Sequence, residues 1–460
     1  MRKELLENKG LVTDKGFYKS LLAIAIPIAL QNVISFGVQM LDTVMVGSLG
    51  AVPLSAVSLA NQFFFVFMVF GFGIASGGAV LISQYWGKGN VDAVRRIMGI
   101  SLRCIVIVSI LFMLAGSAFP KEILRIFSKD EVVVAMGADY LKLVIFSYLF
   151  SGVASCYLNT LRGTENVKLS TFVYLVSFFV NGFFNYCFIF GKFGFPEMGA
   201  AGAAVGTIIA RMSEFAIVMV YGNFIEKKVG FRIKHFFKTE RELFPDFIRH
   251  SLPVIGSELI WSLGAVTQTA IIGNLSTSFV AANSISGVLQ QLAMVMMFGI
   301  GNAAAVLMGK TVGAGEYEKA KKMGRTFLLL ALGVGIISAG LILVLRNPML
   351  SIYRDVTPET KALAFEIMGV MACLMVGTAV EITSIGGILR GSGDTNVAFA
   401  IDAGCTWGVG VTMGYLAGYV WHFPLILVFV CLRTDMLVRI VLCLIRILRG
   451  KYIKNVTREL

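Results

Sequence analysis

The chain has few charged residues and few residues that could form a catalytic or metal centre. Asp, Glu, Lys and Arg make up 15% of its 460 residues, and only three are His. The seven Cys include no CxxC pair, and no GxxxxGK[ST] segment occurs. Such a composition is unsuited to a water-soluble enzyme, and the missing motifs argue against a cysteine zinc site and an ATP-binding loop. We therefore expect no catalytic site, no resident cofactor and no bound metal.

Long apolar runs dominate instead, and hydrophobic residues make up 57% of the chain. A helix of about 20 apolar residues crosses the hydrocarbon of a bilayer, whereas a β-barrel would alternate apolar with polar positions. The predicted fold class is therefore all-α and integral to a membrane, with twelve transmembrane helices. The runs lie near residues 20–47, 54–84, 96–119, 131–160, 168–190, 197–222, 246–273, 279–309, 322–345, 359–389, 394–420 and 423–447.

The second half of the sequence repeats the first. Identical residues recur at a spacing of 226, and the Leu-Arg-Gly of residues 161–163 recurs 228 later at 389–391. Such a repeat predicts two pseudo-symmetric six-helix bundles of equal orientation, as in secondary transporters with a substrate site between the halves. We expect an N-lobe at 1–222, a cytoplasmic linker at 223–245 and a C-lobe at 246–460. The recurring pairs include Pro27/Pro253, Gly47/Gly273, Gly73/Gly299, Gly87/Gly313 and Gly89/Gly315.

The net charge of +13 follows the predicted membrane topology. Lys and Arg gather at the N-terminus, after the second and eighth runs, in the 223–245 linker and at the C-terminus. By the positive-inside rule these segments are cytoplasmic, together with both termini. The basic charge therefore predicts topology, with contact to anionic lipid as a weaker alternative, and it does not indicate nucleic-acid binding.

Four polar residues within predicted spans of the first half form the main candidate site. Asp42 is an acid in the first run, Asn181 and Asn185 lie one helical turn apart in the fifth, and Thr207 lies in the sixth. An ionisable group inside a span is costly without a partner or a cavity. Together these oxygens could hold Na⁺ or bind a carboxyl group that exchanges a proton. The alternatives are that Asp42 caps its helix and that the Asn residues join neighbouring helices.

Three acids of the second half form a second candidate site, for substrate or cation. Glu258, Glu381 and Asp402 lie within predicted spans, and their repeat counterparts are Asn32, Val153 and Tyr174. Acids present in one repeat alone suggest a function, such as attracting cationic ligands. The alternative is that they are paired structural charges.

Other residues in the runs have structural interpretations. Arg211 and Glu214 lie i, i+3 apart, and Asp435 and Arg439 lie i, i+4 apart, so each pair can neutralise itself along one helix. Pro27 lies about four turns before Asp42 and lacks a backbone donor, so it predicts a bend in the first span.

Several segments resemble the multidrug and toxic compound extrusion (MATE) transporters. They are LDTVMVGSLGAVPLSAVS, YWGKGNVDAVRR, FGKFGFPEMGAAGAAVGT and the paired LRG motifs, the second within LRGSGDT. The resemblance implies a V-shaped antiporter of the bacterial inner (plasma) membrane that exports drugs, often cationic, in exchange for H⁺ or Na⁺. It also implies that Asp42, Asn181, Asn185 and Thr207 form the N-lobe cation site. The protein is expected to work as a monomer among membrane lipids.

The resemblance leans toward the NorM-like branch, because Asn185 stands where DinF-like members commonly have Asp. Glu258 and Glu381 lie near the C-lobe acids of NorM-like members but out of register with them. A lipid-linked oligosaccharide flippase of the same superfamily is the main alternative, although it would favour Arg or Lys in its cleft. A channel or a membrane scaffold is a further alternative, and it would show no gradient-coupled flux.

Overall fold

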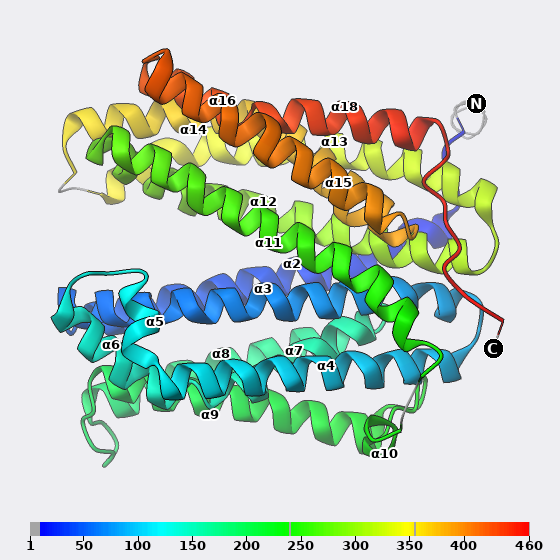
Figure 1. Ribbon diagram of the computed structural model, residues 1–460, viewed down its shortest axis with the longest axis horizontal. Helices are drawn as coiled ribbons and strands as arrows, with labels where there is room; N and C mark the ends of the chain where they lie inside the picture. The colour runs from blue at the N-terminus through cyan, green and yellow to red at the C-terminus, as the bar shows by residue number, and fades with distance from the viewer. Residues whose placement is uncertain (1–9, 239–240, 354–355, 460) are drawn as a thin grey trace. The chain divides into compact units, whose positions relative to one another are not determined.

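The computed structural model describes residues 10–238, 241–353 and 356–459, and these residues form helices and loops without a β-strand. Figure 1 shows the order of the elements along the chain. The first half contains α2 (Lys15–Gly47), α3 (Ala51–Gly87), α4 (Val91–Ala118), α5 (Pro120–Arg125), α6 (Glu131–Val144), α7 (Ser147–Arg162), α8 (Lys168–Phe190), α9 (Ala200–Val220), the π-helical turn η1 (Tyr221–Ile225) and α10 (Ile233–Phe236).

The second half has the same kind of elements with more π-helical turns. It contains α11 (Phe244–Leu275), α12 (Thr277–Gly313), α13 (Tyr317–Ile352), α14 (Pro358–Ile382), η2 (Thr383–Leu389), α15 (Thr395–Cys405), η3 (Thr406–Val411), α16 (Thr412–Tyr415), η4 (Leu416–Val420), α17 (Leu425–Cys431) and α18 (Thr434–Leu448). π-helical turns widen a helix locally and are frequent at functional sites.

Helices cover all twelve predicted apolar runs, and two of the runs are broken. Among the described residues, ten helices are long and apolar enough to cross a membrane, and α6 with α7 makes an eleventh span bent by 57°. The twelfth run forms as α17 and α18, interrupted at Leu432 and Arg433, where the Thr434 hydroxyl donates to the Cys431 carbonyl. The helix α2 runs through Pro27 without interruption, so the bend there stays a prediction.

The chain forms two compact units, and the first residues of each repeat belong to the unit that contains most of the other repeat. We call this the exchange of the repeat starts. Unit 1 comprises Met1–Ala29, Ser83–Gly89 and Gly256–Leu460, and unit 2 comprises Leu30–Ile82 and Asn90–Ile255. The two exchange points, after Ala29 and after Ile255, are 226 residues apart, which is the spacing of the repeat. The helices α2 and α11 therefore each begin in one unit and end in the other. This division differs from the lobes predicted from the repeat, which stay a prediction.

Two recurring glycines mark a close helix crossing inside unit 1. In unit 1, a Cβ on Gly87 would overlap the Lys310 carbonyl, and a Cβ on Gly313 would overlap the Gln84 carbonyl. These two contacts are exact images of each other under the 226-residue repeat, so the ends of α3 and α12 pack around a local pseudo-two-fold axis. Larger residues at Gly87 and Gly313 would force the two backbones apart. The repeat is therefore a feature of packing as well as of sequence.

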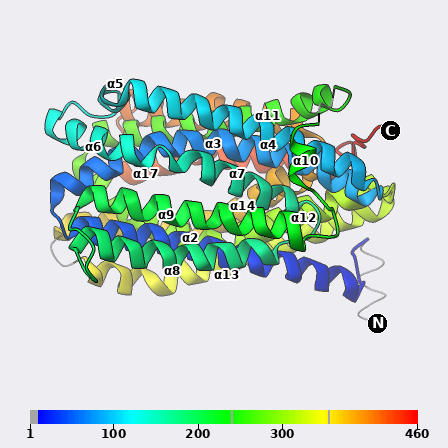
Figure 2. The same ribbon diagram turned by 90° about the horizontal axis from the view of Figure 1, so that it is seen from below.

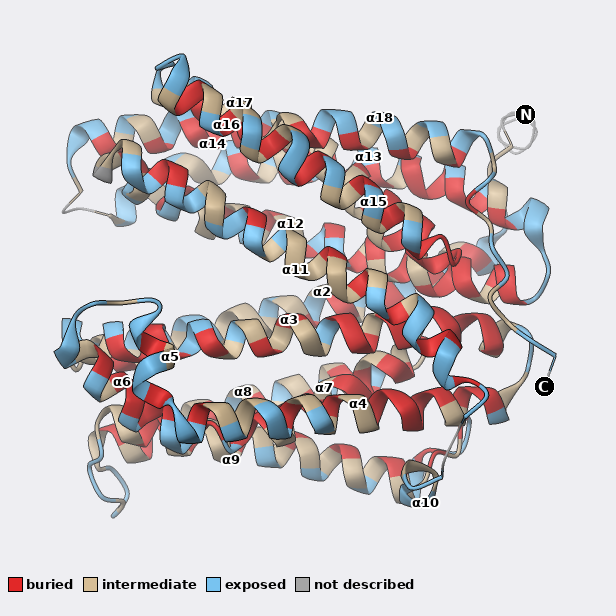
Figure 3. Ribbon diagram, in the orientation of Figure 1, coloured by how far each residue is buried: buried red, intermediate tan, exposed pale blue. Residues whose placement is uncertain are grey.

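The outward faces of the helices are apolar, as expected for a protein surrounded by lipid. On α18 the buried positions Met436, Arg439 and Cys443 fall on one face, while Leu437 and Val441 are exposed on the other. Figure 3 shows such alternating buried and exposed faces along the helices. Within unit 2, α8 and α9 lie side by side, as seen in both Figure 1 and Figure 2. This antiparallel pair carries most of the first candidate site.

Candidate functional site

The helices α2 and α8 bring three of the four first-half candidates into contact inside unit 2. The Asn185 side-chain amide donates to Asp42 Oδ1 at 2.5 Å and to Asn181 Oδ1 at 3.3 Å. Asn181 and Asn185 are buried, with exposures of 2% and 0%. Because the amide nitrogen donates to it, Asp42 is arranged as a carboxylate acceptor. The one-turn spacing of the two Asn residues thus predicted a real shared face.

A close approach of α9 leaves one oxygen of this cluster without a partner. Asn185 Oδ1 is buried and makes no hydrogen bond. A Cβ on Gly206 of α9 would overlap this same oxygen. Gly206 therefore provides the space in which the Asn185 side chain lies. A buried, unpaired carbonyl oxygen beside a carboxylate is a suitable ligand pair for a hard cation such as Na⁺, and it is costly if left unused.

Thr207 belongs to the same region through Tyr140 of α6. The two hydroxyl groups lie close enough for a side-chain hydrogen bond, and Tyr140 is an electrostatic neighbour of Asp42. The structure therefore places Thr207 at the edge of the cluster, where Tyr140 lies between it and Asp42. Tyr140 was not among the predicted site residues, because a Tyr in an apolar run has no distinctive sequence pattern.

Arg211 and Glu214 form the predicted pair and lie next to the cluster. Arg211 NH1 is 2.6 Å from Glu214 Oε1, and the Ser177 hydroxyl donates to the same oxygen at 2.5 Å. Arg211 is also an electrostatic neighbour of Asp42. The pair is thus structural, as expected, and in addition it places a cation near the candidate carboxylate.

The three second-half acids also come together, in unit 1, but each faces an arginine. Glu258 Oε1 lies 2.7 Å from Arg390 NH1, and Glu381 forms an ion pair with Arg439. Asp402 lies between the two arginines, 3.6 Å from Arg390 NH2 and 3.6 Å from Arg439 Nε. We call these five residues, with Asp435, the unit 1 charge cluster.

Arg439 is the most connected member of the unit 1 charge cluster. Its NH2 group lies 2.8 Å from Asp435 Oδ2, which is the predicted i, i+4 pair, and donates to the Thr406 hydroxyl at 2.8 Å. The geometry of these contacts matches the interpretation as paired structural charges. A role of Glu258, Glu381 and Asp402 in binding substrate or cation stays a prediction.

Two buried arginines of the unit 1 charge cluster, Arg390 and Arg439, were not among the predicted site residues. The sequence showed Arg390 as part of a recurring motif and Arg439 as a partner of Asp435 alone. The repeat itself carried the missing signal, because at a spacing of 228 Arg390 corresponds to Arg162 and Arg439 to Arg211. Each repeat thus carries two arginines at equivalent positions. Since Arg390 and Arg439 are already paired with carboxylates, they do not favour the flippase alternative.

Comparisons with known proteins agree with the repeat and with the fold. The MatE family model matches residues 27–187 and 253–416, and the two matches start 226 residues apart. The probable multidrug resistance protein YoeA of Bacillus subtilis is 25% identical over 418 residues, covering 89% of each chain. The probable multidrug resistance protein NorM of Thermotoga maritima is 26% identical over 449 residues, covering 96% of this chain and 95% of the relative.

Solved structures share the whole fold at low sequence identity. An outward-facing multidrug resistance MATE family transporter of the MOP superfamily superposes with a TM-score of 0.86 at 16% identity, covering 96% of this chain and 99% of the other. A MATE crystal structure in the straight conformation gives a TM-score of 0.85 at 16% identity, covering 96% and 100%.

Proposed function

Because the chain belongs to the MATE family of multidrug efflux transporters, we propose that it is a secondary active antiporter. In this proposal it exports organic, often cationic compounds in exchange for H⁺ or Na⁺, by rocking of two lobes. The observation that carries the coupling step is the contact of Asp42 with the buried Asn185, whose Oδ1 has no partner. Members of this family are transporters, and the proposal includes no catalytic step.

The coupling ion would act on hydrogen bonds that the cluster already contains. A proton on Asp42 removes the charge to which the Asn185 amide now donates, so the amide loses its stronger, charge-assisted bond. A Na⁺ ion would instead take oxygens of Asp42, Asn181 and Asn185 as ligands, with Thr207 at the edge. In either case, binding of the ion replaces one set of contacts between α2 and α8 with another. It shifts the transport cycle to the extent that its affinity differs between the states.

Arg211 makes the cluster sensitive to the binding of a small cation. As an electrostatic neighbour of Asp42 it repels an incoming cation, while Glu214, which itself accepts from the Ser177 hydroxyl, holds the guanidinium group in place. Because Glu214 already pairs with Arg211, an ionised Asp42 leaves this group of three residues with one net negative charge in the absence of an ion. Adding Na⁺ or H⁺ makes the region more positive, which would help to drive a change of conformation.

The proposed substrates are small organic molecules, because the relatives YoeA and NorM are named multidrug resistance proteins. Deformable Met side chains and aromatic faces suit varied flat cations, and the chain contains 21 Met and 36 Phe. The proposal places the protein in the bacterial inner membrane as a monomer with both termini in the cytoplasm, and with the N-lobe, linker and C-lobe boundaries predicted from the repeat.

The first test is ethidium accumulation in pump-deficient bacteria that express matched membrane levels of the wild type, Asp42→Asn or Asp139→Asn. Asp139 is a suitable control, because its side chain is exposed and pairs with Lys142 at 3.4 Å. The proposal expects low accumulation with the wild type and with Asp139→Asn, and high accumulation with Asp42→Asn.

The coupling ion is then identified with purified protein in proteoliposomes, under an imposed pH gradient or Na⁺ gradient. Transport driven by one gradient and lost in Asp42→Asn supports the proposed coupling. Gradient-driven transport of the same rate in Asp42→Asn would refute the role of Asp42. Flux that ignores both gradients would refute antiport itself.

A further inference from the structure

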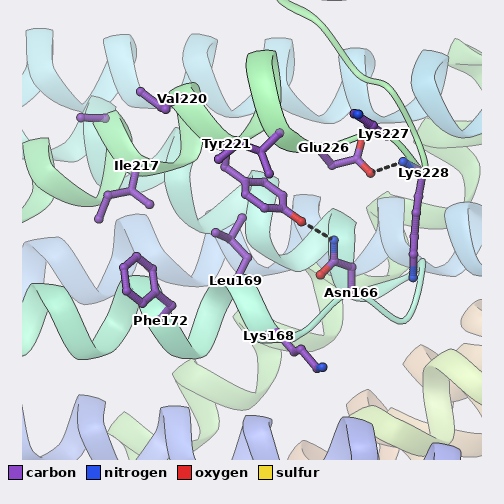
Figure 4. A pocket seen from close by; sticks show the side chains of 12 residues that line it. Asn166, Lys168, Leu169, Phe172, Ile217, Val220, Tyr221, Glu226, Lys227 and Lys228 are labelled. Carbon is purple, nitrogen blue, oxygen red and sulfur yellow. Dashed lines mark hydrogen bonds between the residues drawn. The ribbon is translucent and has the colours of Figure 1, made fainter.

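An open groove lies in unit 2 between the start of α8 and the end of α9, away from the Asp42 cluster. Its volume is about 790 Å³. Leu169 and Phe172 of α8 form one wall, and Ile217 and Val220 of α9 form the other. Figure 4 shows these apolar side chains gathered toward one end of the groove. This apolar end of the groove therefore suits a hydrocarbon chain.

The opposite end of the groove is cationic. Lys168, at the first position of α8, and Lys227 and Lys228, after η1, line it and are exposed. No ion pair links any of the three to an acid of the described chain. The helix α8 also begins without a side-chain cap, so its first backbone N–H groups add positive potential beside Lys168. Three cations and a helix start therefore lie around the same end of the groove.

The one acid that lines the groove is already used by the backbone. Glu226 is buried, and its two carboxylate oxygens accept from the backbone N–H groups of Lys228, Val229 and Gly230 at 2.7, 3.0 and 2.6 Å. These bonds fold the loop that presents Lys227 and Lys228 at the groove. The carboxylate thus shapes the cationic end and forms no ion pair with the lysines.

A tyrosine marks the boundary between the apolar and the cationic ends. Tyr221 lies between them in Figure 4, and the Asn166 amide donates to its hydroxyl oxygen at 3.2 Å. The tyrosine proton stays available to an acceptor in the groove. Tyrosines with an apolar ring and a polar tip are typical of the interface between hydrocarbon and headgroups.

The apolar end of the groove continues into a lipid-facing stripe on α8. Phe172, Leu175, Phe179 and Phe183 are exposed and follow one another at three- and four-residue spacings, on one face of the helix. An occupant of the groove would therefore extend from the lysines into the hydrocarbon region. A free phosphate would use the cationic end alone and leave the apolar walls bare.

We propose that this groove binds an anionic phospholipid. The phosphate lies among Lys168, Lys227 and Lys228, with the Tyr221 hydroxyl as a further donor, and an acyl chain lies between α8 and α9. The charge complementarity selects anionic over zwitterionic lipids, and the apolar walls select a lipid over a soluble anion. The inference concerns lipid binding and does not depend on the proposed transport cycle.

Native mass spectrometry of the purified protein in detergent tests the proposal, with dioleoylphosphatidylglycerol and dioleoylphosphatidylcholine as probes. The variants are Lys168→Gln alone, the triple change Lys168→Gln, Lys227→Gln and Lys228→Gln, and Ala216→Trp, which fills the groove. The charge-matched control changes three exposed lysines elsewhere in the chain, Lys19, Lys322 and Lys451, to Gln. Lipid binding is measured without transport, so failure here is separable from failure of the proposed function.

We expect the first phosphatidylglycerol to bind more tightly than phosphatidylcholine. Its affinity should fall roughly fivefold in Lys168→Gln and on the order of 100-fold in the triple variant, from the electrostatic attraction of about one lysine each. It should also fall in Ala216→Trp and stay unchanged in the control. Equal losses in the control and the triple variant would refute the site. Competition by millimolar inorganic phosphate, with no loss in Ala216→Trp, would show a soluble-anion site instead.

Discussion

Replacing Arg439 by Met should destabilise the protein more than replacing its repeat counterpart Arg211 by Met. The Arg439 side chain is 5% exposed and faces Glu381, Asp402 and Asp435, so its removal leaves three carboxylates without their shared cation. Breaking a buried ion pair by removing one partner costs about 3–5 kcal/mol. The Arg211 side chain is 23% exposed, and its removal leaves one directly paired carboxylate, Glu214, behind.

Glu214, the partner of Arg211, would keep its hydrogen bond from Ser177. Arg211→Met should therefore cost only about 1.5–3 kcal/mol, the range for one hydrogen bond to a charged group. Met is chosen because it keeps the length and apolar contacts of the Arg side chain. Both variants sit at equivalent positions of the two repeats, so differences in helix propensity and in placement along the span are small.

The assay is unfolding in mild detergent with added denaturant, followed by tryptophan fluorescence, for both single variants. A third variant adds Glu381→Gln and Asp435→Asn to Arg439→Met, which removes two of the stranded charges. It should recover part of the lost unfolding free energy, because coupled partners do not contribute additively. The reasoning is refuted if Arg211→Met is as destabilising as Arg439→Met, or if the third variant is no more stable than Arg439→Met alone.

Three further predictions concern other parts of the chain. Gly206→Ala should impair ion-coupled transport, because the new Cβ overlaps Asn185 Oδ1. Gly333→Ala is the control, since the space around Gly333 is open, and it should leave transport unchanged. Ethidium accumulation in cells compares the two variants. Gln84→Ala removes two side-chain bonds to the backbone of the C-terminal segment, at 3.1 and 2.9 Å, and should expose that segment to trypsin at a lower protease concentration. Burial and nearby cations lower the pKa of His235, so the folded protein favours its neutral form. Hydrogen-exchange protection factors in residues 231–238, corrected for the intrinsic pH dependence of exchange, should therefore fall as pH falls below about 6.5, and a His235→Phe variant should lose this dependence.

Much of the fold and of the first site could be predicted because both rest on local periodicity. Apolar length predicted the spans, and the one-turn spacing placed Asn181 and Asn185 on one face of α8. The contact of Asn185 with Asp42, 143 residues away, rested on the family resemblance, since spacing alone cannot show which helices meet. The lobes and the coupling ion stay predictions.

In the unit 1 charge cluster only the i, i+4 pair of Asp435 and Arg439 could be predicted from sequence spacing. The other pairs join different helices, as Glu258 and Arg390 do across 132 residues. The exchange of the repeat starts could not be predicted from the sequence for a different reason. Two similar repeats offer similar packing faces, so a pattern of apolar residues fits either arrangement. Long-range contacts such as that of Gly299 with Ala25 and Ala29 distinguish the two arrangements.

The exchange of the repeat starts has a consequence for how the chain is made. Unit 2 has all of its residues once the ribosome has passed Ile255, whereas unit 1 needs residues up to its C-terminal segment. At about 5–20 residues per second, the remaining 205 residues take roughly 10–40 s to synthesise. During this time the start of α2 and the last turn of α3 are already in the membrane without their packing partners. Biogenesis of this transporter therefore includes an interval in which the first helices are synthesised but the helices they pack against are not. Membrane chaperones that shield unpaired helices would act in that interval.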